Sequence, residues 1–96
     1  MEIKFEKNAS ALKVSVIGRL DTVTSPELDS FINSHICGID SLTIDCAGLE
    51  YVSSAGLRVL LSAQKKLKSS MKLTNVCELV MEVFEMTGFA DILVIE

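Results

Sequence analysis

The sequence predicts an α/β domain with a mixed, mostly parallel β-sheet, an N-terminal antiparallel hairpin and helices packed on the sheet. Two short segments near the N-terminus alternate apolar and polar residues, as half-buried strands do. Later segments of this kind alternate with segments whose apolar residues recur at helical spacing. Strands that alternate with helices usually run parallel, with helices covering the sheet. The predicted element order is therefore ββαβαβαβ.

The first predicted unit is a β-hairpin. Its strands lie at 3–6 and 12–16, where apolar and polar side chains alternate, and residues 8–10 between them are of types common in turns. Gly18 follows the second strand and is predicted to end it.

A first helix is predicted after the hairpin, and residues 22–25 lead into it. Pro26 suits the first turn of a helix because its φ is fixed and it lacks an N–H, and Glu27 lies near the positive end of the helix dipole. Gly38 is a natural stop after this helix. The helical spacing is kept by Leu28, Phe31, Ile32 and Ile36.

A strand and a second helix meet at a pair of serines. Residues 42–46 alternate apolar and polar side chains, and helical periodicity begins just after Ser53 and Ser54. The serines are therefore predicted at a strand-to-helix turn. The apolar residues of this helix are Leu57, Leu60, Leu61 and Leu67, and the cations near its end are Lys65, Lys66 and Lys68.

The last part of the chain predicts a strand, a third helix and a final strand. Ser69 and Ser70 break the chain before a short strand at 71–74. Asn75 is the predicted cap of the third helix, and Gly88 ends it. Residues 92–95 are an apolar run long enough for a buried strand. One buried apolar stripe of the third helix is predicted to consist of Leu79, Val80, Val83 and Phe84.

Composition limits the classes of function. The chain of 96 residues is predicted to be a single domain, 1–96, and its 49% of hydrophobic residues argue against disorder. The formal net charge of −4 argues against nucleic acid as a direct partner, because neutralising phosphates requires a surplus of Lys and Arg. No apolar run approaches the roughly 20 residues that span a bilayer, and no signal-peptide pattern is seen, so we expect a cytoplasmic protein without membrane contact.

The sequence offers no residue set for catalysis, a metal or a cofactor. Cys37, Cys46 and Cys77 are odd in number and widely spaced, which predicts reduced, mostly buried thiols. No cysteine lies at ligand spacing from another, and His35, the only histidine, is expected to be an ordinary residue near a helix end. A Gly-rich phosphate loop and a serine paired with a histidine base are also missing, so we do not expect an enzyme.

Gly56 distinguishes the serine turn from an ordinary capped helix. A serine at this turn can cap the helix by accepting a hydrogen bond from a backbone N–H two or three residues on. That role leaves Gly56 unexplained, because glycine within a helix costs about 0.5–1 kcal/mol relative to alanine. The glycine predicts a bare backbone beside an exposed hydroxyl, where a partner protein could approach closely.

The run from Leu49 to Leu60 resembles the signature of STAS domains, specifically the bacterial anti-sigma factor antagonists. In that family the motif usually reads Asp-Ser-Ser/Thr-Gly-Leu, and the serine directly after the aspartate is phosphorylated by an anti-sigma factor that is also a kinase. The resemblance places this serine at Ser54. Ser53 replaces the usual aspartate and Ala55 the following Ser/Thr, so Ser53 is a second candidate acceptor.

Two further segments resemble the same family in the same order along the chain. The residues from Gly18 to Asp21 resemble its Gly-x-Leu-Asp turn, which lies near the phosphorylation site and takes part in partner contact. The residues from Val83 to Phe89 resemble its last amphipathic helix and the glycine that ends it. The resemblance thus covers nearly the whole chain.

The resemblance implies an anti-sigma factor antagonist that switches partners. Unphosphorylated protein would bind an anti-sigma factor serine kinase and release a sigma factor, phosphorylation would end the binding, and a metal-dependent serine/threonine phosphatase would restore it. The free protein is expected to be a monomer. The residues expected to bind the partner are Gly18, Leu20, Asp21, Thr22, Ser53, Ser54, Ala55, Gly56, Leu57 and Arg58.

Two other functions stay open at this point. Some STAS domains are not phosphorylated and serve as scaffold subunits of transport complexes, and Ser53 in place of the aspartate is compatible with that role. A sensor that holds a nucleotide or another small anion at the turn near Ser54 is the other, because helix N-termini bind anions readily.

Overall fold

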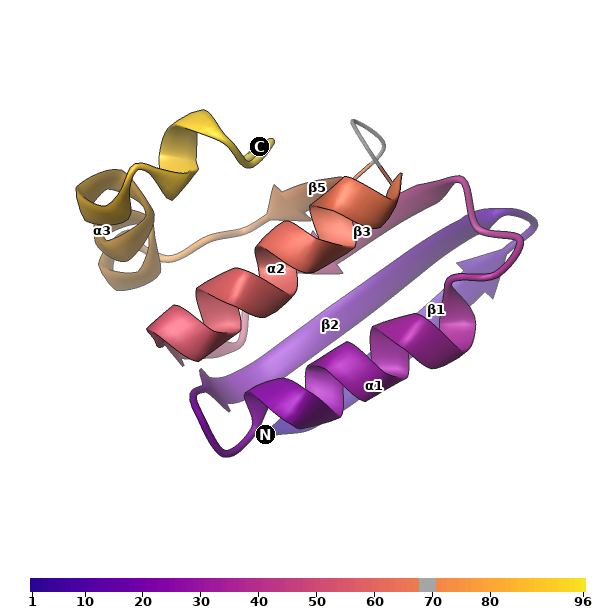
Figure 1. The fold of residues 1–96 in the computed structure, drawn as a ribbon, viewed down its shortest axis with the longest axis horizontal. Coiled ribbons are helices and arrows are strands. Elements are labelled where there is room, and N and C mark those ends of the chain that lie inside the picture. The colour runs from indigo at the N-terminus through magenta and orange to yellow at the C-terminus, as the bar shows by residue number, and fades with distance from the viewer. Residues whose placement is uncertain (68–70) are drawn as a thin grey trace.

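The computed structural model describes residues 1–67 and 71–96. Lys68 and the predicted break at Ser69 and Ser70 lie outside the described residues. The elements in chain order are β1 (Glu2–Asn8), β2 (Ala11–Leu20), α1 (Ser25–His35), β3 (Ser41–Asp45), β4 (Leu49–Val52), α2 (Ser54–Leu67), β5 (Met71–Thr74), α3 (Glu78–Thr87) and the 3-10 helix η2 (Phe89–Asp91) (Figure 1).

The strands form one mixed sheet, which confirms the predicted fold class. The order is β1-β2-β3-β5, with β1 antiparallel to β2 and the other pairs parallel. Strand β2 runs on to Leu20, so the prediction that Gly18 ends it is wrong. It pairs with β3 through residues 11–15 and with β4 through residues 18–20, and the β4 pairing contains a register shift between Gly18 and Arg19. The length of β2 lets it pair with two parallel neighbours in succession.

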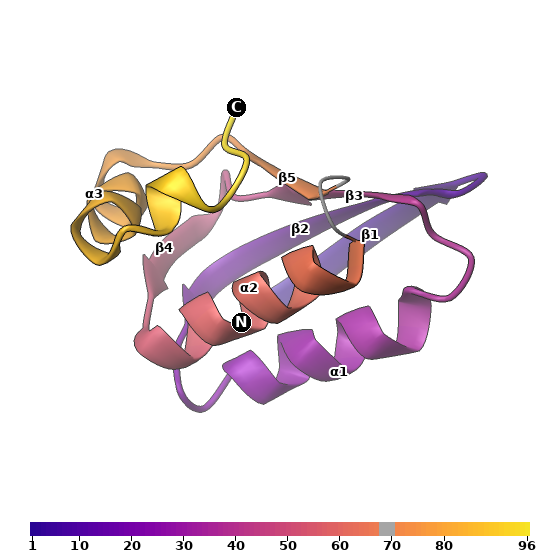
Figure 2. The same ribbon diagram turned by 45° about the horizontal axis from the view of Figure 1, so that its top comes forward.

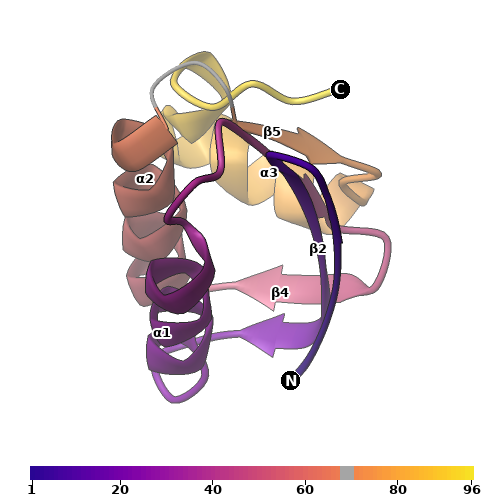
Figure 3. The same cartoon turned by 90° about the vertical axis from the view of Figure 1, so that its right-hand side faces the viewer.

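Helices α1 and α2 lie side by side on one face of the sheet (Figures 1 and 3). Strand β2 shows why, because Leu12, Val14 and Val16 are buried while the intervening Lys13 is exposed and Ser15 half-buried. This alternation turns the apolar side chains of the strand towards the helices. His35 lies in the last turn of α1, as predicted, and its ring stacks on Phe31 at 4.1 Å between centroids.

The strand β4 was not predicted, so the element order requires a correction. Only four residues long, it buries Leu49 and Val52 and exposes Glu50 and Tyr51. This pattern has neither the alternation of a half-buried strand nor the length of a buried one. It is a strand because the end of β2 lies beside it, and the local sequence does not show that neighbour.

The predicted final strand at 92–95 is also wrong. The chain forms η2 and then makes a single parallel bridge between Leu73 and Ile95. Ile92 and Val94 are 47% and 43% exposed, so the apolar run is not buried on both sides. Its neighbour β5 has only four residues, which leaves a short edge on which to pair.

The start and the apolar face of α3 differ from prediction. Asn75 does not cap this helix. Its backbone has φ +57° and its side-chain amide donates to Asp45 Oδ1 at 3.1 Å. Cys77 occupies the N-cap position, but its Sγ donates to the carbonyl oxygen of Leu49 at 3.5 Å and does not cap the helix. The predicted stripe divides: Val80 and Phe84 are buried, Val83 is half-buried and Leu79 is 68% exposed. Gly88 ends the helix in the left-handed conformation (φ +81°), as predicted.

The three cysteines are free thiols, but only one of them is fully buried. Cys46 is buried, Cys77 is half-buried and Cys37 is exposed. Burial, together with the nearby negative charge of Asp45, raises the pKa of the Cys46 thiol to about 12. None of the helices that the structure describes is long and apolar enough to cross a membrane.

Candidate partner-binding site at the start of α2

The serine turn and the turn after β2 lie next to each other. Leu20 pairs with Val52 in parallel register at the ends of β2 and β4. Just beyond this pair, the backbone N–H of Ser53 donates to the carbonyl oxygen of Leu20 at 2.9 Å. Figure 3 shows the two strands ending side by side, next to the starts of α1 and α2. The segments that the sequence singled out are therefore brought together by the sheet.

The two serines have different surroundings. Ser53 is the helix cap: its Oγ accepts a hydrogen bond from the N–H of Gly56 at 3.3 Å, and its carbonyl oxygen accepts one from the N–H of Leu57 at 2.9 Å. Ser54 is the first residue of α2, and its side chain is exposed. The hydroxyl of Ser54 is thus presented to solvent at the positive end of the helix dipole, with no capping duty.

Gly56 is explained by packing inside the molecule rather than by a partner. It is buried, and a Cβ atom there would lie 2.8 Å from both the Cγ and the carbonyl oxygen of Leu20, and 2.9 Å from Cγ2 of Val52. Glycine lets the first turn of α2 approach the ends of β2 and β4. The sequence predicted that a partner protein would approach the bare backbone at Gly56, but the segments that approach it are β2 and β4 of this chain.

Burial divides the predicted partner-binding residues into a surface and its support. Leu20, Gly56 and Leu57 are buried and hold the site together from below. The remaining members reach the surface: Thr22, Ser54 and Arg58 are exposed, and Gly18, Asp21, Ser53 and Ala55 are half-buried.

Asp21 organises the turn between β2 and α1. Its Oδ1 accepts hydrogen bonds from the backbone N–H groups of Val23 and Thr24, each at 3.0 Å, and its own N–H donates to Thr24 Oγ1 at 2.9 Å. The hydroxyl of Thr24 in turn donates to the carbonyl oxygen of Arg19 at 2.7 Å. The N–H of Thr24, followed by the other bonds of the turn, lowers the pKa of Asp21 from its ordinary value of 3.8. Asp21 thus fixes the turn as a carboxylate.

Arg19 and Tyr51 form a feature of this surface that sequence reasoning missed. They pair in register across β2 and β4, and the guanidinium carbon of Arg19 lies 4.2 Å from the centre of the Tyr51 ring. Arg19 Nε is also 3.9 Å from Asp21 Oδ2. The register of β4 was the signal needed to find this pair, and that strand was not predicted.

Asp45, at the carboxyl end of β3, belongs to a separate polar cluster with Asn75 and the backbone N–H of Ala47. Its Oδ1 accepts the side-chain amide of Asn75 and, at 3.0 Å, the N–H of Ala47. These two bonds lower the pKa of Asp45 from 3.8. They join the loop after β3 to the loop after β5 and so serve the fold. Among residues 1–67 and 71–96, no group of three His, Cys, Asp or Glu residues could hold a metal ion.

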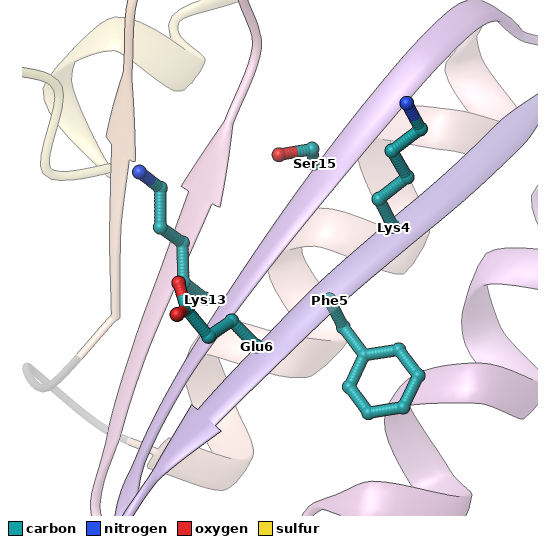
Figure 4. A pocket seen from close by; sticks show the side chains of 5 residues that line it. All are labelled: Lys4, Phe5, Glu6, Lys13 and Ser15. Carbon is teal, nitrogen blue, oxygen red and sulfur yellow. The ribbon is translucent and has the colours of Figure 1, made fainter.

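A hollow of about 380 Å³ on the hairpin has no part in this site. It is lined by Lys4, Phe5, Glu6, Lys13 and Ser15 (Figure 4). Figure 4 shows Phe5 directed away from the lysines, and its ring packs against Phe31 of α1 at 5.1 Å between centroids. The charged groups of both signs around the hollow are exposed on the strands, and none belongs to the start of α2.

Comparison with known proteins identifies a family and several relatives of the chain. A family model described as the Mlab STAS domain matches residues 3–95. BtrV of Bordetella bronchiseptica, described as an anti-sigma factor antagonist, is 31% identical over 96% of this chain and 83% of its own length. The anti-sigma-B factor antagonist of Listeria monocytogenes is 31% identical over 100% of this chain and 87% of its own.

Solved structures share the fold. An anti-sigma factor antagonist from Mycobacterium paratuberculosis superposes with a TM-score of 0.86 at 24% identity, covering 98% of this chain and 83% of its own. SpoIIAA of Bacillus in its phosphorylated form gives a TM-score of 0.75 at 16% identity, covering 99% of this chain and 91% of its own. Because the family model matches nearly the whole chain, the chain belongs to the STAS domain family, among the anti-sigma factor antagonists.

Proposed function

We propose that the chain is an anti-sigma factor antagonist controlled by phosphorylation of Ser54. Without phosphate, the monomer binds an anti-sigma factor that is a serine kinase, and the sigma factor held by that kinase is released. With phosphate on Ser54, the complex separates. The observation that carries this proposal is the exposed Ser54 hydroxyl at the start of α2, beside a cap that is made by Ser53.

The phosphorylation step needs only an accessible hydroxyl from this chain. Ser54 Oγ attacks the γ-phosphorus of ATP held by the kinase, an O–P bond forms, and the bond to the bridging oxygen breaks so that ADP leaves. The hydroxyl proton passes to a base on the kinase. Ser53 is the weaker acceptor because the residue is half-buried and its Oγ already accepts a hydrogen bond from the N–H of Gly56.

The fold should tolerate the phosphate. The first N–H groups of a helix have no partner within it, and those of Ser54 and Ala55 stand at the positive end of the α2 dipole. They can meet the oxygens of a phosphoserine, which carries about −1.5 to −2 charges. SpoIIAA, which shares this fold, has been solved in a phosphorylated form and supports the same expectation.

Partner binding, in contrast, should not tolerate the phosphate on Ser54. The phosphate would add bulk and negative charge to the surface formed by the exposed members of the predicted partner-binding residues, where a partner would have to pack closely. A loss of about 3 kcal/mol weakens binding roughly a hundredfold, which is enough for a switch. A metal-dependent serine/threonine phosphatase would reset the protein, because the phosphate on an exposed first residue of a helix stays accessible.

The test is a pull-down from the native cell lysate with wild type, Ser54→Asp and Ser54→Ala, followed by addition of ATP to the captured complex. We expect wild type and Ser54→Ala to retain a kinase-like protein and Ser54→Asp to lose it. On adding ATP, wild type should gain one phosphate at Ser54 and leave the partner. Ser54→Ala should gain none and stay bound. Ser53→Ala is the matched control for the acceptor and should also gain one phosphate at Ser54.

Two outcomes would overturn the proposal. If Ser54→Asp holds the kinase as tightly as wild type and Ser54→Ala is still phosphorylated, Ser54 is not the switch. If all variants retain the same transport subunit and none gains phosphate, the chain is a scaffold of a transport complex instead.

A further inference from the structure

Helix α3 carries apolar side chains on two faces. Val80 and Phe84 are 1% and 0% exposed and pack into the core. Leu79, Val83 and Met86 follow the spacing i, i+4 and i+7 and so form a second stripe. On this stripe Leu79 is 68% and Met86 is 86% exposed. Val83 is half-buried and packs against the edge of the core, so the fold accounts for it. Covering the core does not account for the exposed Leu79 and Met86.

The second stripe forms one wall of a groove. Residues Glu50, Tyr51 and Val52 of β4 form the other wall, and the groove encloses about 220 Å³. Figure 2 shows α3 beside β4, at the end of the sheet away from the hairpin turn. Because Tyr51 is 39% exposed, both walls offer apolar surface to solvent. Contiguous exposed apolar surface of this kind is typical of interaction sites, whereas single exposed side chains are not.

The rim of the groove is acidic. Glu50 and Glu82 line it, Glu78 lies on the same helix, and α3, which is described in full, has no Lys or Arg. Arg19 lies over the ring of Tyr51, but its charge is offset by Asp21, since Arg19 Nε is 3.9 Å from Asp21 Oδ2. An occupant of this groove therefore gains from carrying apolar side chains between positive ones.

We infer that the groove between α3 and β4 binds an amphipathic helix of a partner protein, with Leu, Met or Phe side chains as anchors and Lys or Arg on either side. Helices of this kind place side chains at i, i+3, i+4 and i+7 into apolar grooves. Met86 suits the role because its flexible thioether adapts to the shape of an anchor. The inference goes beyond the proposed function, since the groove does not use the Ser54 hydroxyl and should bind whether or not Ser54 is phosphorylated.

The test uses synthetic peptides, so it does not depend on identifying the partner. The probe is an amphipathic peptide of Leu and Lys of about 15 residues, long enough to form a helix when bound. Its controls are a Leu/Glu peptide of the same pattern and a scrambled Leu/Lys peptide. We expect the amphipathic Leu/Lys peptide to bind most tightly, to lose affinity as salt is raised, and to shift the NMR methyl signals of Leu79, Val83 and Met86.

Variants on the protein locate the binding. Leu79→Ser/Met86→Ser should weaken peptide binding about tenfold or more, because both anchoring contacts are lost. Val94→Ala, which removes an apolar side chain 43% exposed outside the groove, should leave affinity unchanged, and so should Ser54→Asp. Equal binding of the Leu/Glu peptide, methyl shifts elsewhere, no binding, or self-association of the protein through the groove would overturn the inference. Those results would leave the role of Ser54 untouched.

Discussion

Helices α2 and α3 both bury one face, but their outer faces differ. In α2 the buried residues lie on a single face, and Ser54, Arg58, Lys65 and Lys66 are among the exposed ones. The helix starts with a serine cap and a glycine that fits against β2 and β4. In α3 the residues of the buried face are also almost fully buried, but Leu79 and Met86 are exposed to solvent and no side chain caps the start of the helix.

This difference shows which residues the fold itself requires. Stability alone accounts for α2, where every apolar residue is buried or half-buried and Gly56 has no room for a side chain. Stability does not account for the exposed residues of the second stripe of α3, because an exposed Met or Leu adds little to the free energy of unfolding. Substitutions on the two faces of α3 should therefore have different effects on the free energy of unfolding.

The largest effect is expected within α3 itself. Phe84→Ala should lower the free energy of unfolding by about 3–5 kcal/mol, because it removes a buried aromatic ring and leaves a cavity. Met86→Ala should change it by no more than about 0.5 kcal/mol, because that side chain is exposed. Urea unfolding followed by circular dichroism measures both. If Phe84→Ala does not fold, Phe84→Leu gives a smaller loss of the same sign. Equal losses at the two positions would mean that α3 does not have two different faces.

A second comparison concerns the start of α2. Alanine normally stabilises a helix by about 0.5–1 kcal/mol relative to glycine. At Gly56 the sign should reverse, because the new Cβ would meet the backbone oxygen of Leu20, which cannot move aside as a flexible side chain can. Overpacking of this kind costs about 1–3 kcal/mol. A rise in the urea midpoint of Gly56→Ala would show that α2 has room to shift and that packing does not fix this glycine.

The two adjacent serines provide the next test. Ser53→Ala removes the acceptor for the N–H of Gly56 and should destabilise the protein by about 1 kcal/mol. Ser54→Ala should not lower the free energy of unfolding, because alanine is the best helix former and the Ser54 side chain is exposed. Amide hydrogen exchange at Gly56 should quicken only in Ser53→Ala. The reverse pattern would identify Ser54 as the cap and remove the basis for its role as a free hydroxyl.

The periodicity of apolar residues in the sequence was enough to predict those elements of the fold that depend mainly on neighbouring residues. The hairpin, the strand at 42–46 and the three helices follow from alternation and from helical spacing, so the predictions of these elements were confirmed. The placement of Ser53 and Ser54 at a strand-to-helix turn was also confirmed, because caps and turns are set by neighbouring residues.

Features that depend on distant neighbours could not be predicted in this way. Strand β4 exists because the end of β2 lies beside it, and residues 92–95 do not form a strand because β5 offers only a short edge. The stacking of Arg19 on Tyr51 needs the register of those two strands, and the true reason for Gly56 needs the position of Leu20. Each of these facts joins segments that are separated along the chain.

The smallest effect on stability is expected at Asp21, in the turn between β2 and α1. The pKa of Asp21 is lowered in the folded protein, so its stabilising contribution is complete above the ordinary value of 3.8 and is lost as pH falls through the lower folded value. Asp21→Asn keeps an acceptor oxygen but cannot titrate. Wild type should therefore be more stable than Asp21→Asn near pH 6, and the gap should close as the pH falls below about 4. The measurement is the urea midpoint at a series of pH values. Asp45→Asn removes the other carboxylate whose pKa is lowered, and adding it should flatten the profile further. If wild type and both variants lose stability in parallel, acid acts elsewhere and the turn is held by its backbone alone.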